Sequence, residues 1–515
     1  MDPQAGSSIF DDEDERSPFS SPQTPDPFPR IVREAPLPTD GEPVGLSTQE
    51  ILDWQAQQRQ ARLQGEYQRS ARLLNDIVYD NLQTNLPLAS LRVLNTRQTR
   101  STFLSSLLTP LLTARQPASE DPTLGSLLEL TQEVKQALVP FGLFKRIDVR
   151  LEQAQSLLAR EGAVDVVVDV EEAGRVTLKS GTEFGQAEGS AYITGDVRNV
   201  FGGAETLSVS SSVGTKTRSA FEASLKTPLF ASPLQSLVLS VFSLDRDNTS
   251  YASHWEGLQG GKLTWEKRNF FGGHSITYEA TQRTLQNLLP NASLSVREAA
   301  RPGPSLKSSL MYAYASDTRD KTFLGTTGRL FKASQEIAGL GGSAFFLKST
   351  TETTFSRAIG TEGLFASFSA RAGAVLPMFK DRPVHLADRL LAGGPTGVRG
   401  FKMNGMGPRD GEDSLGGDLM YSIGVSLFSP LPIKPEWPFK LHAFANAGKL
   451  TSLGATPKES ISPLFATAPS VSAGVGLVYD FSPVRIEANF TLPLVGSRKE
   501  GLSKGFSLGM GMDFL

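Results

Sequence analysis

The sequence predicts a mainly β protein, in which a sixteen-stranded antiparallel transmembrane β-barrel follows one small α/β domain and a disordered N-terminal tail. Segments of about ten residues that alternate apolar and polar side chains recur over residues 176–515, which is typical of barrel strands. Helical and strand periodicities mix in residues 85–175, ahead of these segments. Nowhere do about 18 apolar residues run together, which excludes a transmembrane helix; a barrel strand needs lipid-facing residues only at every second position.

The composition argues against several classes of function, among them nucleic-acid binding and catalysis by cysteine or a metal. The formal charge of the 515 residues is −3, which makes nucleic acid a poor candidate partner. The absence of cysteine excludes disulfides, thiolate metal sites and a cysteine nucleophile. The four histidines lack metal-ligand spacing, and the hydrolase-like segment Gly505–Gly509 is followed by only six residues, none of them histidine. We therefore predict no enzyme, no cofactor and no metal site.

Residues 1–46 form a tail of distinct composition, with nine prolines and ten acidic residues against three basic ones. A segment with few apolar residues and a net charge of −7 cannot offset the entropy cost of ordering, so we predict disorder. The tail also lacks the features of a secretory signal or a matrix presequence. Ser47-Thr48-Gln49-Glu50 fits a capping box, which predicts a helix over residues 47–84.

Residues 85–175 predict a small domain with the element order β-α-α-β-β. Two helical clusters are followed by one strand that alternates through Ile147, Val149 and Leu151 and by another over residues 164–170. The segment Pro140-Phe141-Gly142-Leu143-Phe144 after the second helix resembles the helix-end signature of a POTRA domain. Together with the element order, it predicts one POTRA domain.

The barrel prediction for residues 176–515 rests on strand faces and on strand number. In residues 484–492, apolar side chains at even positions oppose polar side chains at odd positions. About sixteen such segments fit into the 340 residues, at about 21 per strand and turn, and an even number leaves both ends of the wall on one side. A soluble sandwich remains the alternative, because a single strand does not distinguish the two.

One turn sequence occurs twice. Asn199-Val200-Phe201-Gly202-Gly203 recurs seventy residues later as Asn269-Phe270-Phe271-Gly272-Gly273. Paired glycines permit the positive φ that a tight hairpin requires, so we interpret the repeat as turn chemistry.

The most specific motif lies in a long loop between strands, at about residues 378–417. Glycines in this loop let the backbone fold back, and one arginine among them can project into a polar lumen and pair with an acidic wall residue. Such a loop either stiffens the barrel as a plug or couples barrel shape to substrate passage. The motif residues are Gly393, Gly394, Val398, Arg399, Gly400 and Phe401.

The last strand, over residues 505–514, carries a second motif. Ser507, Gly509, Met512 and Phe514 fit a polar-x-Gly-x-x-hydrophobic-x-hydrophobic pattern that resembles the β-signal of mitochondrial outer-membrane barrel proteins. With the loop motif, one POTRA-like domain and sixteen strands, the chain resembles the BamA superfamily of outer-membrane assembly proteins. Within that superfamily, the single POTRA domain and the acidic tail are most similar to the mitochondrial branch, which comprises the core barrels of the sorting and assembly machinery.

This resemblance implies an insertase for β-barrel precursors of the mitochondrial outer membrane. A client β-signal strand would pair with the first strand of this barrel at a lateral gate between its first and last strands. We expect the first strand at about residues 182–196, where glycines weaken side-chain packing. The gate residues predicted on it are Gly185, Gly189, Ala191 and Ile193.

The same resemblance implies the partners. The clients would be outer-membrane β-barrel precursors such as the general import pore and the voltage-dependent anion channel. Metaxin-like peripheral subunits would bind the cytosolic face, a second barrel subunit and membrane lipid would adjoin the wall, and the POTRA domain and N-terminus would lie in the intermembrane space. The alternatives are a protein-conducting channel that threads polypeptide through the lumen, and a passive metabolite pore, which the long loop would obstruct.

The resemblance also bears on the partner of Arg399. In bacterial relatives the loop arginine meets an acidic residue in a segment that here offers Asn446. Asp480 and Glu487 occupy lumen-facing positions of late strands and are alternative partners. We predict that Arg399→Ala weakens barrel stability or assembly.

Overall fold

The computed structural model divides the chain into two compact units, residues 1–82 and 83–515. It describes residues 60, 65, 72–115, 122–156, 159–185, 188–321, 324–360, 363–379, 381–432, 434–454, 464, 467–481, 484–496 and 500–511. The predicted tail over residues 1–46 and most of the predicted helix over 47–84 lie outside these residues. Residues 72–80 are helical. No helix in the described ranges is both long enough and apolar enough to cross a membrane.

The second unit begins with a small α/β domain. Its elements are β1 (Leu88–Leu94), α2 (Ser101–Arg115), α3 (Leu124–Leu138), the 3-10 turn η1 (Val139–Phe141), β2 (Phe144–Gln153) and β3 (Val164–Glu172). The sheet order is β1-β3-β2, with β3 parallel to β1 and antiparallel to β2. Both helices and the sheet contribute to one apolar core, which includes Leu130, Val134 and Val166. Gly142 ends the helical segment with φ 60°, a conformation that favours glycine.

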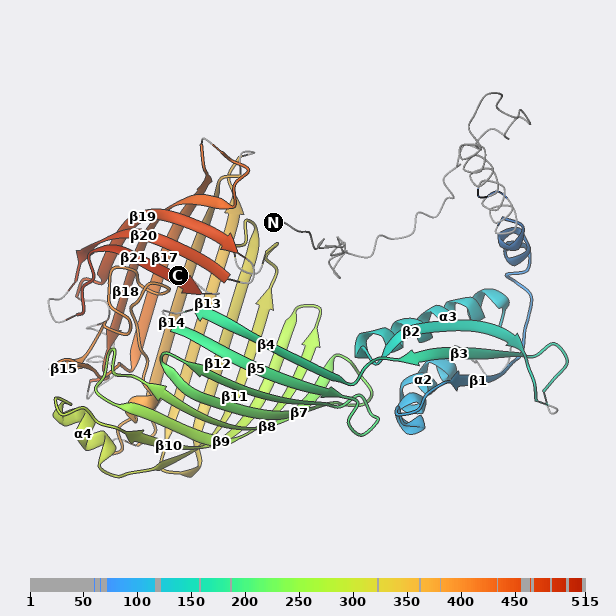
Figure 1. Ribbon diagram of the computed structural model, residues 1–515, viewed down its shortest axis with the longest axis horizontal. Helices are drawn as coiled ribbons and strands as arrows, with labels where there is room; N and C mark the ends of the chain where they lie inside the picture. Colours follow the sequence, from blue (N-terminus) through green and yellow to red (C-terminus); the bar gives the residue numbers. More distant parts are fainter. Residues whose placement is uncertain are drawn as a thin grey trace, which may run out of the picture. The chain divides into compact units, whose positions relative to one another are not determined.

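Sixteen antiparallel strands follow and form one sheet in chain order, which confirms the predicted number. Figure 1 shows them running side by side from β4 to β21. Their bounds are β4 (Val176–Gly185), β5 (Glu188–Arg198), β6 (Thr206–Gly214), β7 (Thr217–Pro228), β8 (Gln235–Asp247), β9 (Trp255–Asn269), β10 (Gly272–Gln286), β11 (Ser305–Asp317), β12 (Gly328–Gly342), β13 (Phe346–Ala358), β14 (Phe365–Pro377), β17 (Leu419–Pro430), β18 (Phe439–Thr451), β19 (Ser470–Phe481), β20 (Val484–Val495) and β21 (Gly505–Gly511).

The strand faces distinguish a membrane barrel from a soluble sandwich. On β20, Glu487 and Asn489 are buried inside the barrel, whereas Phe490 is 52% exposed on the outer face. On β8, Ser240 is buried and its neighbour Val241 is exposed. A soluble sandwich would bury the apolar face and expose the polar one. The inverted arrangement fits a wall with lipid outside and a polar lumen inside.

The predicted first strand over residues 182–196 is wrong. That stretch is a hairpin, in which β4 ends at Gly185 and β5 begins at Glu188, with Thr182 paired to Ala191. Gly189, Ala191 and Ile193 therefore lie on the second strand, and only Gly185 lies on the first. Gly185, Gly189 and Gly195 are spread over both strands, so glycine content did not mark the turn between them.

The sheet has two ends, formed by β4 and β21. Each of the other fourteen strands pairs with a strand on both sides, whereas β4 pairs with β5 and β21 pairs with β20. Among the described residues, no β-ladder joins β21 to β4. In the described part of the wall, the ladder of hydrogen-bonded strands is therefore interrupted at the seam between β21 and β4.

Candidate functional site: the inward loop and the barrel seam

The loop between β14 and β17 folds back into the barrel. It contains a 3-10 turn η2 (Leu386–Asp388) and a short hairpin of β15 (Arg409–Asp410) and β16 (Asp413–Ser414). Val398, Phe401 and Met406 from this loop are buried in an apolar cluster that also includes Val375 and Leu450 of the wall. The predicted motif therefore forms part of the interior of the barrel.

Glycine is required where the loop touches the wall. Gly400 has φ 83°, and a Cβ atom there would lie 2.9 Å from Cγ2 of Thr491 and 3.1 Å from Cβ of Ser472. Gly393 and Gly394 also have positive φ, at 101° and 120°. These conformations favour glycine, and at Gly400 the missing side chain also permits close approach to β19 and β20.

Arg399 lies at the centre of a buried polar cluster on the inner wall. Its Nε donates to Oε2 of Glu487 at 3.0 Å and its Nη2 donates to Oε1 at 3.2 Å, and both side chains are fully buried. Nη1 donates to Oδ1 of Asn446 at 3.4 Å. The guanidinium carbon also lies 4.8 Å from the ring centroid of Phe444, within cation–π range. Of the three candidate partners, Glu487 and Asn446 contact Arg399, and the side chain of Asp480 lies outside the described residues.

Glu487 is shared by further donors from its own strand. Arg485 forms a second ion pair with Oε1, and Nδ2 of Asn489 donates to Oε2 at 2.8 Å. The carboxylate thus joins the loop to β20 through a branched network of ion pairs and hydrogen bonds. These partners offset the cost of burying its charge. Arg485 and Asn489 were not predicted to join this cluster, although they lie two residues either side of Glu487 and therefore on the same strand face.

His442 completes the cluster from β18. Its ring stacks on Phe428 with centroids 4.5 Å apart, and its Nδ1 lies 3.4 Å from Oδ1 of Asn489. No partner was predicted for His442 from the sequence, because its spacing from the other histidines does not fit a metal site. Among the described residues, no group of three or more acidic or histidine side chains is arranged to hold a metal ion.

The loop also binds the segment that leads into the last strand. The amide of Lys402 donates to the carbonyl of Gly501 at 2.6 Å, and the amide of Ser503 donates to the carbonyl of Gly400 at 2.9 Å. Phe401 and Leu502 form an isolated antiparallel bridge between these contacts. One loop tip therefore contacts both β20 and the residues immediately before β21.

The outer part of the loop is fastened to other loops at the same end of the barrel. Asp413 accepts hydrogen bonds from the amide and hydroxyl of Ser253, at 2.7 and 2.6 Å, and from the amide of Ser293 at 2.8 Å. Asp410 accepts from the hydroxyl of Ser295, in α4 (Leu294–Ala300), at 2.8 Å. These contacts hold the loop across the barrel end.

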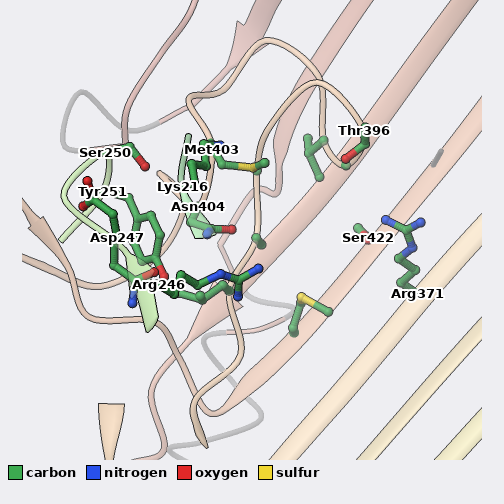
Figure 2. A pocket seen from close by; sticks show the side chains of 17 residues that line it. Lys216, Arg246, Asp247, Ser250, Tyr251, Arg371, Thr396, Met403, Asn404 and Ser422 are labelled. Carbon is green, nitrogen blue, oxygen red and sulfur yellow. The ribbon is translucent and has the colours of Figure 1, made fainter. Parts of the chain in front are cut away.

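A cavity of about 340 Å³ remains beside the loop tip. Figure 2 shows Arg246 and Tyr251 on one side of it and Arg371 and Ser422 on the other. This volume is in the range of small-molecule pockets. The loop therefore does not fill the lumen completely beside its tip.

The last strand presents the predicted faces. Phe506 and Leu508 are exposed on the outer face, while Ser507 and Gly509 lie on the inner face opposite Asn489 and Glu487. Met512 and Phe514 of the predicted β-signal lie outside the described residues. The final strand therefore places a hydroxyl and a glycine, with no bulky side chain, beside the Glu487 cluster.

Comparisons with known proteins agree with this geometry. Residues 199–514 match the Omp85 superfamily domain. The SAM50-like protein SPAC17C9.06 of Schizosaccharomyces pombe is 35% identical over 448 residues, which cover 86% of this chain and 94% of that protein. The human sorting and assembly machinery component 50 homolog is 31% identical over 398 residues, which cover 75% and 82% of the two chains. The chain belongs to the SAM50 family of the Omp85 superfamily.

A solved structure shows the same fold. BamA from Haemophilus ducreyi lacking POTRA domains 1–3 superposes with a TM-score of 0.67 at 15% sequence identity, covering 82% of this chain and 84% of that one. The predicted family and fold class are thereby confirmed. As a family member, the chain is a barrel insertase of the mitochondrial outer membrane.

Proposed function

We propose that this protein inserts client β-barrels by strand exchange at the seam between β4 and β21. The observation that carries the proposal is the absence of a ladder between these strands among the described residues. In lipid, each unpaired amide or carbonyl is costly because no water satisfies it. A client strand can satisfy the edge of β4 by β-augmentation, through main-chain bonds that make little demand on sequence.

The edge strand is suited to temporary pairing. Its outer face carries Ser180 and Thr182 beyond the apolar Val176 and Leu178, so only part of the face is strongly apolar. Gly181 on its inner face is covered by the ring of Tyr192 of β5, since a Cβ atom there would lie 3.0 Å from the Tyr192 hydroxyl oxygen. Such a strand contributes few cross-strand side-chain contacts of its own, and main-chain bonds dominate its pairing.

The inward loop supplies the fixed side of the gate. Arg399 holds β20 through Glu487, while backbone bonds from residues 400–402 hold the segment before β21. We infer that β20 stays braced when β21 separates from β4, and that the weaker backbone contacts at residues 501–503 adjust. This assigns the loop a coupling function and retains its function as a plug.

The finer features of the family belong to the same proposal. The β-signal strands of precursors, among them the general import pore and the voltage-dependent anion channel, would enter from the intermembrane space, where the POTRA domain and the N-terminus would lie. Metaxin-like peripheral subunits would bind the opposite face, and a second barrel subunit would pack on the wall. Strand exchange replaces hydrogen bonds with equivalent ones, so we propose no covalent chemistry and no cofactor.

A crosslinking experiment tests the seam. The chain has no cysteine, so Ser180→Cys on β4 gives a single thiol on the edge strand. A precursor that carries one cysteine at successive positions of its β-signal strand is arrested during import into mitochondria. We expect disulfides with a period of two residues that shift by two when Leu178→Cys replaces Ser180→Cys.

Ala191→Cys provides the matched control, because Ala191 lies on the same face but one strand further from the seam. It should give no register-specific disulfide. Crosslinks only from lumen positions, such as Thr194→Cys, would contradict the seam and favour the protein-conducting channel instead.

A further inference from the structure

The POTRA domain meets the barrel through the turn between β5 and β6 as well as through the chain itself. The amide of Arg100 donates to the carbonyl of Gly202 at 2.8 Å, and Nη2 of Arg100 lies 2.6 Å from Oε1 of Glu205. Nδ2 of Asn199 donates to the hydroxyl of Thr99 at 3.0 Å. Asn199, Glu205 and Thr99 are buried, so these are protected contacts between residues about 100 positions apart.

The barrel side of this contact is held in one shape. Oδ1 of Asn199 accepts from the amide of Ala204 at 3.0 Å. Oε2 of Glu205 accepts from the amides of Phe201, at 3.2 Å, and Gly203, at 2.8 Å. The two side chains that face the POTRA domain therefore also close their own turn.

The POTRA side is equally fixed. Glu172, the last residue of β3, accepts from the amide of Gln98 at 3.1 Å and from the amide and hydroxyl of Thr99 at 3.0 and 2.9 Å. Since Thr99 accepts from Asn199, a continuous chain of hydrogen bonds runs from the end of the POTRA sheet into the turn.

The short connection between the two parts adds a third anchor. Arg175 precedes β4, and its Nη2 donates to the carbonyls of Asn199 and Val200 at 2.8 and 3.1 Å. Ala204 of the turn and Ala231 of the β7–β8 connection pack against the POTRA core. The POTRA domain is thus fastened to the hairpins that begin with the edge strand β4.

The repeated turn motif provides an internal comparison. At Gly202, φ is 85°, and a Cβ atom would lie 2.5 Å from the carbonyl oxygen of Gln98 in the POTRA domain. In the second copy, Phe270 is 97% exposed, and a Cβ atom at Gly273 would meet no described atom within 4 Å. Gly272, the counterpart of Gly202, has φ 155° and lies against the carbonyl of Ala315 in the neighbouring strand, so the two copies differ in conformation, and it is the first copy that contacts the POTRA domain.

We propose that the turn over residues 199–205, here called the POTRA seat, is a positioning element for insertion. It fixes the POTRA domain relative to β4 and β5, so that a client strand leaving the domain arrives at the edge of β4. Arg100, Asn199, Gly202 and Glu205 are the positioning residues. The inference rests on the proposed function and adds an element to it that neither the seam nor the inward loop contains.

Two measurements on the full chain test the seat. Nitroxide labels at Leu128→Cys, on α3, and Phe270→Cys, on the second turn, report the distance between domain and barrel by electron–electron resonance in lipid nanodiscs. Gly202→Ala should broaden this distance distribution and slow precursor insertion several-fold in mitochondria that contain the variant as their sole copy. Arg100→Ala should do the same without altering any barrel residue.

Gly273→Ala, in the second copy of the motif, is the control and should change neither measurement, because a Cβ atom there would meet no described atom within 4 Å. An unchanged distance distribution in both Gly202→Ala and Arg100→Ala would overturn the seat. A broadened distribution with normal insertion would overturn its positioning role. Loss of the crosslink at Ser180→Cys in the otherwise unaltered protein would contradict the seam instead, and this result is independent of the distance measurement.

Discussion

The POTRA domain and the barrel use the same alternation of apolar and polar residues in opposite directions. The POTRA core is built from apolar side chains of both helices and the sheet, with Leu130 and Val134 among those excluded from solvent. The barrel wall instead buries Glu487 and Asn489 on its inner face, where they meet Arg399 of the loop, and exposes apolar side chains such as Val241 and Phe490 on its outer face. In the POTRA domain, the shapes of the apolar side chains determine how the core packs. Lipid accepts any apolar outer face, so in the barrel the matched charges and hydrogen bonds of the inner face determine how the parts fit together.

This difference predicts where single substitutions will be most damaging. A buried charge that loses its partner remains unsolvated, whereas an apolar core that loses methylenes is left with a cavity. Variants at Arg399, Leu130 and Gly400 are each compared with a second position that lacks the relevant contact.

The largest effect should follow from Arg399→Ala. It leaves Glu487 buried beside the remaining Arg485, and breaking such a pair typically costs about 3–5 kcal/mol. We expect a lower urea midpoint for barrel unfolding, measured from the gel mobility of the folded form in detergent. Lys402→Ala on the same loop is the control, because its side chain is exposed. Equal midpoints for the two variants would show that the loop contributes no stability through its arginine.

The next largest effect should come from Leu130→Ala in the POTRA core. Leu130 is 1% exposed, and such truncations cost about 2–5 kcal/mol through lost transfer energy and the cavity left behind. Leu239→Ala on the outer face of β8 should lack the cavity contribution, since lipid fills the space, and should cost only about 0.8 kcal/mol per lost methylene. Urea-dependent proteolysis of the domain and gel mobility of the barrel measure the two separately. A larger cost at Leu239 would contradict the comparison.

Much of the barrel could be predicted because strand faces follow from local alternation. The position of Arg399 in an inward loop was also predictable, since glycines and one charge lie close together in the sequence. The choice between Glu487 and Asn446 was not, because alternation places a residue on a face but leaves its height relative to a long loop undefined. The structure shows that Arg399 contacts both residues.

Contacts that join distant segments were beyond the sequence. The boundary between β4 and β5 was not predictable because glycines occur along both strands and do not mark the turn between them. The POTRA seat joins residues 98–100 to residues 199–205. Neither segment carries a sequence pattern that predicts contact with the other. The repeated motif was visible in the sequence, but its two copies form different turns, because residues 199–205 separate β5 from β6 whereas residues 270–271 separate β9 from β10.

A smaller effect is expected from Gly400→Ala in the inward loop. Its φ of 83° and the 2.9 Å approach of a Cβ atom to Thr491 should together cost about 1–3 kcal/mol. Gly411 on the same loop also has positive φ, at 59°, but a Cβ atom there would meet no described atom within 4 Å. Gly411→Ala should therefore cost only about 1 kcal/mol. The difference between their urea midpoints measures the close approach alone. Equal midpoints would mean that the loop tip shifts away from β20 at little cost.

The smallest effect concerns the pH dependence of the POTRA seat. Burial acts to raise the pKa of Glu172, but hydrogen bonds from Gln98 and Thr99 outweigh it and hold the pKa below its ordinary value of 4.5. The carboxylate form therefore stabilises the joint at any pH above that ordinary value, and this contribution is lost as the pH falls through the lowered pKa. The label distance between residues 128 and 270 should stay narrow from neutral pH to about pH 5 and broaden only in stronger acid. Glu172→Gln, which keeps the shape but not the charge, should remove this dependence and leave a distribution of intermediate width at all pH values. A dependence that persists in Glu172→Gln would contradict the assignment of the titration to Glu172.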